Sequence, residues 1–302
     1  MVNSSGKARR LGAYFLLLVT TFFWGTTFVI VKQAVEQVGV FLFLSQRFSL
    51  AFLILLVICL ILRRSFKKEY LKGGIIMGAL LFGSFAFQTM ALLYTTASNT
   101  AFLTGLNVVL VPIAGAILLK HSVNHSVKLG VILAAAGLYL LCTNGGWSFN
   151  RGDILAMTCA ACIALHLIFT GRFARESDVY WLTTIQIGVV ALFSTLMAKF
   201  GGNEILVWHQ EILWALVICV LFATIFAFLV QTSMQRFTSP THTALIFCME
   251  PVFAALYAYW AIGERFGARG LIGATLILAG MVVSEISFPT WFFRKSRTGE
   301  LD

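Results

Sequence analysis

The chain has 302 residues, of which 59% are hydrophobic and only 11% are charged, and its mean hydropathy is +0.90. A soluble domain normally carries about 25% charged residues, so the composition excludes an ordinary water-soluble protein and indicates a chain embedded in lipid. The net charge of +10 does not indicate nucleic-acid binding, because the basic residues lie in short flanks between apolar runs, where they determine membrane topology.

Ten apolar runs account for most of the chain, and no gap between them could hold a separate folded domain. The first run follows a short basic segment, as in a signal peptide. It is too long for one and has many successors, so we expect it to be retained as a helix. The predicted fold class is an all-α polytopic membrane protein with ten transmembrane helices. The predicted spans are about Leu11–Val31, Gly39–Leu62, Gly73–Tyr94, Asn99–Leu119, Val127–Cys142, Ile154–Thr170, Tyr180–Lys199, Ile212–Ser233, Pro240–Ile262 and Gly267–Ser284.

The Lys and Arg residues are unequally divided between the two sets of loops. If the N-terminus is cytoplasmic, the inner segments hold sixteen of the 22 and the outer segments hold five, with Arg47 inside a span. Cytoplasmic loops of membrane proteins carry the excess of positive charge. We therefore expect an integral protein of the bacterial inner membrane with both termini in the cytoplasm.

The two halves of the chain resemble each other in sequence. The segment LGVILAAAG at 129–137 is similar to IGATLILAG at 272–280, with both glycines in register. Five helices in each half mean that the second copy enters the membrane from the opposite side. We predict two inverted five-helix repeats, residues 1–146 and 147–302, the second ending in a short basic tail.

Two spans contain a proline near the middle. Glu250 stands beside Pro251 in the span 240–262, and Pro112 lies in the span 99–119. Proline cannot donate a backbone hydrogen bond, so the carbonyl four residues earlier is left free, which a bilayer tolerates only beside protein or a water-filled cavity. Interrupted helices in corresponding halves mark a transporter's binding site. Pro112 and Pro251 are therefore predicted to have a structural or gating role, and the same role is predicted for Arg47 in the span 39–62.

Polar and aromatic residues fall at similar depths when each span is followed at about 1.5 Å per residue. Such a layer is typical of a central cavity near the bilayer midplane. Thr27 and His166 also occupy equivalent places in the two halves. The predicted substrate-binding residues are Trp24, Thr27, Gln88, Asn107, His166 and Glu250.

Most of these residues also have a purely structural interpretation. Gln88 and Asn107 could join helices through amide hydrogen bonds, and His166 and Trp24 could be packing residues. These alternatives stay open at the level of sequence.

Glu250 needs a protein or water environment, because a carboxylate at the midplane costs about 2.5–3.5 kcal/mol on insertion scales. Arg47 is the only basic residue at comparable depth, which leaves three interpretations. Glu250 forms a structural ion pair with Arg47, it offers its charge to a substrate ammonium group, or, unpaired, it carries a proton and couples transport to pH.

Enzyme motifs are absent from the sequence, which has no GxSxG, HExxH or phosphate-binding glycine-rich pattern. Cys159 and Cys162 form a CxxC without a second pair or a nearby histidine, so we expect no metal and no cofactor. The competing class is an intramembrane enzyme with Glu250 and His166 as acid and base. Inverted repeats argue against an enzyme, because a catalytic site does not need to open to both sides of the membrane.

Short motifs along the chain resemble those of one transporter family. They are Phe23-Trp24-Gly25, Thr96-Ala97-Ser98, the run from Phe102 to Pro112, Gly137-Leu138-Tyr139, Arg151-Gly152-Asp153, Met249-Glu250-Pro251-Val252-Phe253 and Gly263-Glu264-Arg265. With them the chain is similar, over nearly its whole length, to EamA-type ten-helix transporters of the drug/metabolite transporter superfamily. The resemblance implies export or exchange of small metabolites, often amino acids.

The resulting hypothesis is a carrier that moves a small polar or amphipathic metabolite by alternating access through a central cavity. An uptake carrier for a vitamin, nucleoside or similar nutrient is the alternative. The expected partners are the small-molecule substrate and membrane lipid, with no nucleic acid, and the oligomeric state is left open.

Overall fold

The computed structural model describes residues 3–95, 97–119, 123–142, 150–202, 210–262 and 267–285. Within these ranges the chain forms helices and no strands, and the helices make ten passes, which confirms the predicted fold class. The passes are α1 (Asn3–Val38), α2 (Val40–Ile61), α3 (Glu69–Tyr94), α4 (Ala97–Gly105) with α5 (Asn107–Leu119), α6 (His125–Cys142), α7 (Arg151–Phe173), α8 (Val179–Phe200), α9 (Leu213–Val220) with η2 (Leu221–Phe226) and α10 (Ala227–Met234), α11 (Pro240–Phe247) with α12 (Glu250–Ile262), and α13 (Ala268–Glu285).

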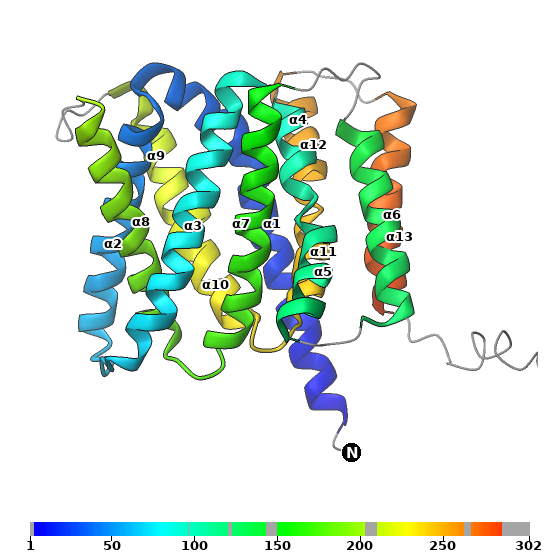
Figure 1. Ribbon diagram of the computed structural model, residues 1–302, viewed down its shortest axis with the longest axis horizontal. Helices are drawn as coiled ribbons and strands as arrows, with labels where there is room; N and C mark the ends of the chain where they lie inside the picture. The colour runs from blue at the N-terminus through cyan, green and yellow to red at the C-terminus, as the bar shows by residue number, and fades with distance from the viewer. Residues whose placement is uncertain are drawn as a thin grey trace, which may run out of the picture.

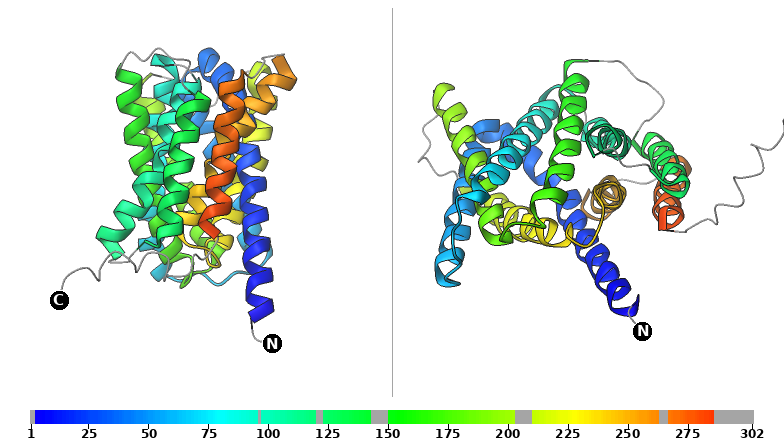
Figure 2. Two further views of the ribbon diagram at one scale, coloured as in Figure 1. Left: turned by 90° about the vertical axis from the view of Figure 1, so that its right-hand side faces the viewer. Right: turned by 60° about the horizontal axis from the view of Figure 1, so that its bottom comes forward.

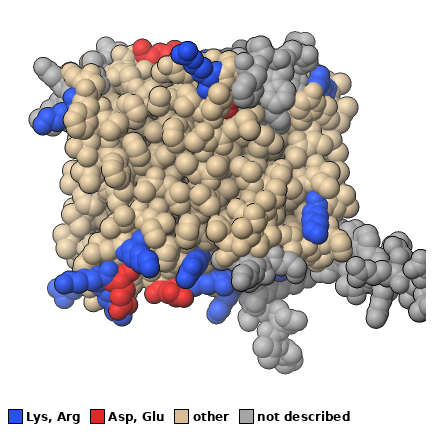
Figure 3. Space-filling model, in the orientation of Figure 1, with Lys and Arg blue, Asp and Glu red and all other residues tan. Residues whose placement is uncertain are grey.

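Six of the described helices or continuous passes are long and apolar enough to cross a membrane, among them Ala8–Val38 and Leu213–Met234. Shorter apolar helices, such as those at 125–140 and 268–284, accompany them. Charged side chains gather toward the two ends of the face in Figure 3 and leave a broad uncharged band between them. Such a band suits the hydrocarbon core of a bilayer, which excludes charge.

Consecutive passes run in opposite directions, and the described ends of the chain, Asn3 and Glu285, lie at the same end of the bundle (Figure 1). The first helices of the two halves, α1 and α7, therefore cross the membrane in opposite directions. This is the arrangement of an inverted repeat. The predicted division between residues 146 and 147 lies outside the described residues and stays a prediction.

The helix α6 packs on α13 at one edge of the bundle (Figure 2). A Cβ atom on Gly280 would lie 2.6 Å from the Gly130 carbonyl oxygen, and one on Gly137 would lie 2.6 Å from that of Gly273. Gly130 corresponds to Gly273 in the other repeat, and Gly137 corresponds to Gly280. The repeat symmetry therefore relates the two contacts to each other. Since helices gain no hydrophobic driving force against lipid, this close backbone approach supplies the packing.

Local signals in the sequence account for several helix ends. Asn150 and Asp153 form a capping box at the start of α7, in which the Asn150 side chain accepts from Gly152 N at 2.7 Å and Asp153 accepts from Asn150 N at 2.9 Å. Gly39 has φ of 82° between α1 and α2, a conformation that a residue without Cβ adopts readily. These features allow tight connections between neighbouring passes.

The interruption predicted at Pro112 is wrong in position. Pro112 lies inside α5, and the pass breaks at Leu106, whose backbone N–H donates to the Leu103 carbonyl at 3.3 Å. In the second half α11 ends at Phe247 and α12 begins at Glu250, with Cys248 and Met249 between them. Pro251 therefore sits in the first turn of α12, where its missing N–H costs least.

Candidate functional site

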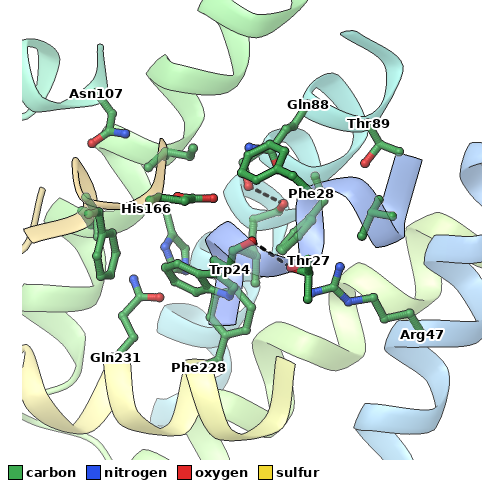
Figure 4. Close-up of a pocket in the computed structure, with 18 of the residues that line it drawn as sticks. Trp24, Thr27, Phe28, Arg47, Gln88, Thr89, Asn107, His166, Phe228 and Gln231 are labelled. Carbon is green, nitrogen blue, oxygen red and sulfur yellow. Dashed lines mark hydrogen bonds between the residues drawn. The ribbon is translucent and has the colours of Figure 1, made fainter. Parts of the chain in front are cut away.

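A cavity with about 90 Å³ of space for the centres of water-sized molecules lies between the two repeats (Figure 4). Each repeat contributes to its wall, through α1, α2, α3 and α5 on one side and α7, α10, α11 and α12 on the other. All six residues predicted to bind substrate line it, together with Arg47: Trp24, Thr27, Gln88, Asn107, His166 and Glu250. The structure thus brings these side chains together, and their binding role stays a prediction.

Aromatic rings form the apolar part of the wall. The Trp24 ring lies 4.9 Å from that of Phe247 and 5.4 Å from that of Phe228, centroid to centroid. Phe85 continues the row at 6.0 Å from Phe228. A wall that combines aromatic rings with convergent polar groups is typical of sites for small organic solutes.

The two helix breaks place one polar residue each at the cavity. Asn107 is the first residue of α5, and Glu250 is the first residue of α12. The Asn107 Nδ2 donates to the Thr104 carbonyl at 2.8 Å, whereas its Oδ1 is buried without a hydrogen-bond partner in the described part of the chain. An acceptor left unpaired in this way is costly unless a ligand or water binds it.

Arg47 does not pair with Glu250. Its guanidinium group donates from Nε to Thr224 Oγ1 at 2.8 Å and from Nη2 to the Ala223 carbonyl at 3.2 Å. It also lies over the ring of Phe85, 4.9 Å from the centroid. The ion-pair interpretation of Glu250 is therefore wrong, since Arg47 is held by neutral groups and π faces. The cavity wall carries a guanidinium group and a carboxyl group that no ion pair joins.

The partners of Arg47 come from a wide turn within a single pass. The segment η2 (Leu221–Phe226) between α9 and α10 is a π-helix, in which the Thr224 hydroxyl donates to the Cys219 carbonyl, five residues earlier, at 2.8 Å. The Ala223 carbonyl accepts from Trp24 Nε1 at 2.9 Å as well as from Arg47. Single π turns of this kind are frequent at functional sites.

His166 is held by an amide rather than by an acid. Its Nε2 lies 2.9 Å from Gln186 Oε1, and Gln186 Nε2 donates to Thr232 Oγ1 at 3.2 Å. No acid–base pair of His166 with Glu250 is assembled. Among the described residues no group of three or more His, Cys, Asp or Glu side chains could hold a metal ion.

Sequence reasoning missed Gln231, whose Oε1 is buried with no partner among the described residues, and which also lines the cavity. The sequence contains a signal for Gln231, because the pair Gln88-Thr89 recurs as Gln231-Thr232. The separation in sequence is the same as that between Asn107 and Glu250. Figure 4 shows Gln88 and Gln231 on different sides of the Trp24 ring. The amides are therefore repeat partners within one cavity.

Comparisons with known proteins agree with this architecture. The model of the EamA-like transporter family matches residues 11–143 and again residues 150–285. An uncharacterized transporter of Archaeoglobus fulgidus is 31% identical over 92% of this chain and 87% of its own length. The uncharacterized transporter YyaM of Bacillus subtilis is 27% identical over 92% of this chain and 94% of its own.

A solved crystal structure has the same fold, with a TM-score of 0.75 at 19% identity over 91% of this chain and 96% of that one. The family model covers nearly all of the chain in two consecutive copies, and both copies contribute to the cavity described above. The chain is a transport protein of the membrane and belongs to the EamA-like transporter family.

Proposed function

We propose that the protein carries a small zwitterionic metabolite, an amino acid or a related compound, across the bacterial inner membrane by export or exchange. The observation that carries this proposal is the presence of Arg47 and Glu250 in one cavity without an ion pair between them. A solute with a carboxylate and an ammonium group would complement both charges at once.

Two further acceptors favour the ammonium end of such a solute. Asn107 and Gln231 line the cavity, and the Oδ1 of the first and the Oε1 of the second are buried without partners in the described part of the protein. An ammonium group has three donors and no acceptor, so it can bind oxygens of this kind. The aromatic wall around Trp24 suits an apolar side chain of the solute.

Alternating access is supported by the position of the cavity between two repeats of opposite orientation. A site at a repeat interface can open to either side when one repeat rocks against the other. The intramembrane enzyme hypothesis gains no support, because His166 binds Gln186 and not Glu250. The uptake of a vitamin or nucleoside has no observation in its favour.

Counterflow in proteoliposomes tests the proposal. Vesicles loaded with an unlabelled mixture of L-amino acids should accumulate a labelled member of the mixture transiently, and empty vesicles should not. Assays on right-side-out and inside-out cell vesicles then give the direction. No counterflow with any L-amino acid, together with counterflow of a nucleoside or vitamin, would refute the proposed substrate class.

A further inference from the structure

The wide turn η2 belongs to the second repeat and forms hydrogen bonds with two cavity-lining residues of the first repeat, Trp24 and Arg47. The Ala223 carbonyl accepts hydrogen bonds from Trp24 on α1 and from Arg47 on α2, and the Thr224 hydroxyl accepts one from Arg47 Nε. In a regular α-helix a mid-helix carbonyl is bound by the N–H four residues later and points along the axis. The π turn changes that register, so its polar groups can serve side chains of neighbouring helices.

Thr224 is suited to this task by both of its bonds. Its Oγ1 donates its hydrogen to the Cys219 carbonyl at 2.8 Å, which leaves its lone pairs for the Arg47 Nε donor at 2.8 Å. The residue is fully buried and does not line the cavity, so a solute would not touch it. Arg47 itself is 2% exposed and lines the cavity.

A guanidinium group on a flexible side chain needs such support to keep one orientation. Phe48 and Phe85 accept its charge on their ring faces, at 5.2 Å and 4.9 Å from the centroids, but rings do not fix the rotation of the planar group. The bond to Thr224 and the bond to Ala223 engage two different nitrogen atoms and therefore set both its position and its plane.

We propose that Thr224 is a positioning residue, which through the wide turn η2 aims the Arg47 guanidinium at an anionic group of the transported solute. The inference rests on the proposed function, because the anionic group is the carboxylate of the proposed zwitterion. The hydroxyl at residue 224 thereby determines how strongly the carrier prefers a solute with a carboxylate to one without it.

The first test is a cycle of melting temperatures for the purified protein, which needs no solute. The variants are Thr224→Val, which keeps the shape and removes the hydroxyl, Arg47→Leu, and the double variant. In the wild-type background Thr224→Val leaves a buried guanidinium group without one of its acceptors. The substitution should therefore lower the melting temperature at least twice as much in the wild-type background as in the Arg47→Leu background. Equal effects in both backgrounds would overturn the inference. Arg47→Gln replaces Arg47→Leu if the latter does not fold.

The second test measures selectivity in the counterflow assay, with the L-amino acid that is exchanged fastest and with its carboxamide as competitor. Thr224→Val should raise the apparent KM for the amino acid about tenfold. The maximal rate and the inhibition constant of the carboxamide should each stay within about twofold of their wild-type values. Thr224→Ser, which keeps the hydroxyl, should behave as wild type. A structural defect would instead change both ligands alike or lower the maximal rate, and either result contradicts the proposal.

Thr21→Val is the matched control. Thr21 is equally buried, its hydroxyl donates to the Leu17 carbonyl of its own helix at 2.8 Å, and it does not line the cavity. Its substitution should leave the selectivity unchanged. If the wild type exchanges no amino acid, the proposed function fails and the role of Arg47 toward a solute fails with it. Exchange that is intact and insensitive to Thr224→Val overturns the positioning role alone.

Discussion

At the scale of single residues, Glu250 is the side chain with the strongest expected effect on transport. It lines the cavity at the start of α12 and has no ion pair with Arg47. We expect Glu250→Gln to reduce counterflow at least tenfold at subsaturating solute, because the neutral amide loses the charge attraction to an ammonium group. Counterflow measured between pH 5.5 and pH 8.5 separates the two remaining roles. A proton carrier predicts that exchange survives and loses its pH dependence, and a substrate ligand predicts that exchange is lost at every pH.

The double variant with Arg47→Gln serves as the control for this prediction. A structural ion pair would make the second substitution restore stability, because each charge would otherwise remain uncompensated. Since Arg47 binds Thr224 and Ala223 instead, we expect the two losses of melting temperature to add. Restoration of melting temperature and transport in the double variant would contradict the geometry of the site. Wild-type transport in Glu250→Gln alone would remove Glu250 from the proposed mechanism.

Asn107 allows a prediction in which stability and activity separate. Its Oδ1 is a buried acceptor without a partner among the described residues. Asn107→Leu removes that unpaired acceptor, so the melting temperature should not fall by more than about 2 °C, although the amide bond to Thr104 is lost. Counterflow should fall several-fold, because the solute loses a ligand. The combination is typical of a residue retained for function rather than for stability.

Thr183 supplies the comparison for Asn107. Its Oγ1 is also buried without a partner in the described part of the chain, but it does not line the cavity. Thr183→Val should therefore be neutral or stabilising and leave counterflow unchanged. A fall in melting temperature of Asn107→Leu as large as its fall in transport would favour the interhelical-amide interpretation instead.

At the scale of the helices, the pair α6 and α13 depends on the absence of side chains at three glycines, Gly130, Gly137 and Gly280. A Cβ on Gly280 would lie 2.6 Å from the Gly130 carbonyl oxygen, so even one methyl group must push the backbones apart. Alanine favours an isolated helix by about 1 kcal/mol over glycine. We nevertheless expect Gly280→Ala to destabilise the protein by about 1–3 kcal/mol, seen as a lower melting temperature.

Gly12→Ala on α1 is the control for the packing effect, because nothing lies within 4 Å of the added Cβ. It should be neutral or slightly stabilising. If Gly280→Ala is as harmless as Gly12→Ala, the two helices do not pack through their backbones.

The sequence predicted the passes better than their irregularities. Apolar runs and glycine spacing identified ten helices and the repeat, because burial in lipid imposes both patterns. Proline was a misleading signal for the break in α4 and α5, since a helix can carry Pro112 within a turn while the chain breaks at Leu106. The π turn at Leu221–Phe226 has no marker in an apolar segment, and with it the partners of Arg47 could not be foreseen. The register of the paired glycines, extended to Gln88, leads to Gln231.

At the scale of the whole molecule, the direction of each pass predicts which loops share a side of the membrane. Ser65 lies between α2 and α3, and Lys199 lies near the opposite end of α8. In a background in which the native cysteines are replaced by alanine, Ser65→Cys should react with an impermeant maleimide only after cells are opened. Lys199→Cys should react in intact cells. Labelling of both from the same side would contradict the ten-helix arrangement.

The paired polar residues of the cavity have a consequence for what the carrier can distinguish. A cavity built from two identical halves would present the same group at both ends and could not tell the two ends of a solute apart. Gln88 and Gln231 preserve that likeness, whereas Asn107 and Glu250, at the same spacing, do not. Divergence between the copies at such positions therefore breaks the symmetry and lets a molecule with two unlike ends bind in one orientation. New substrate preferences could then evolve by changing one copy while the other conserves the shared framework.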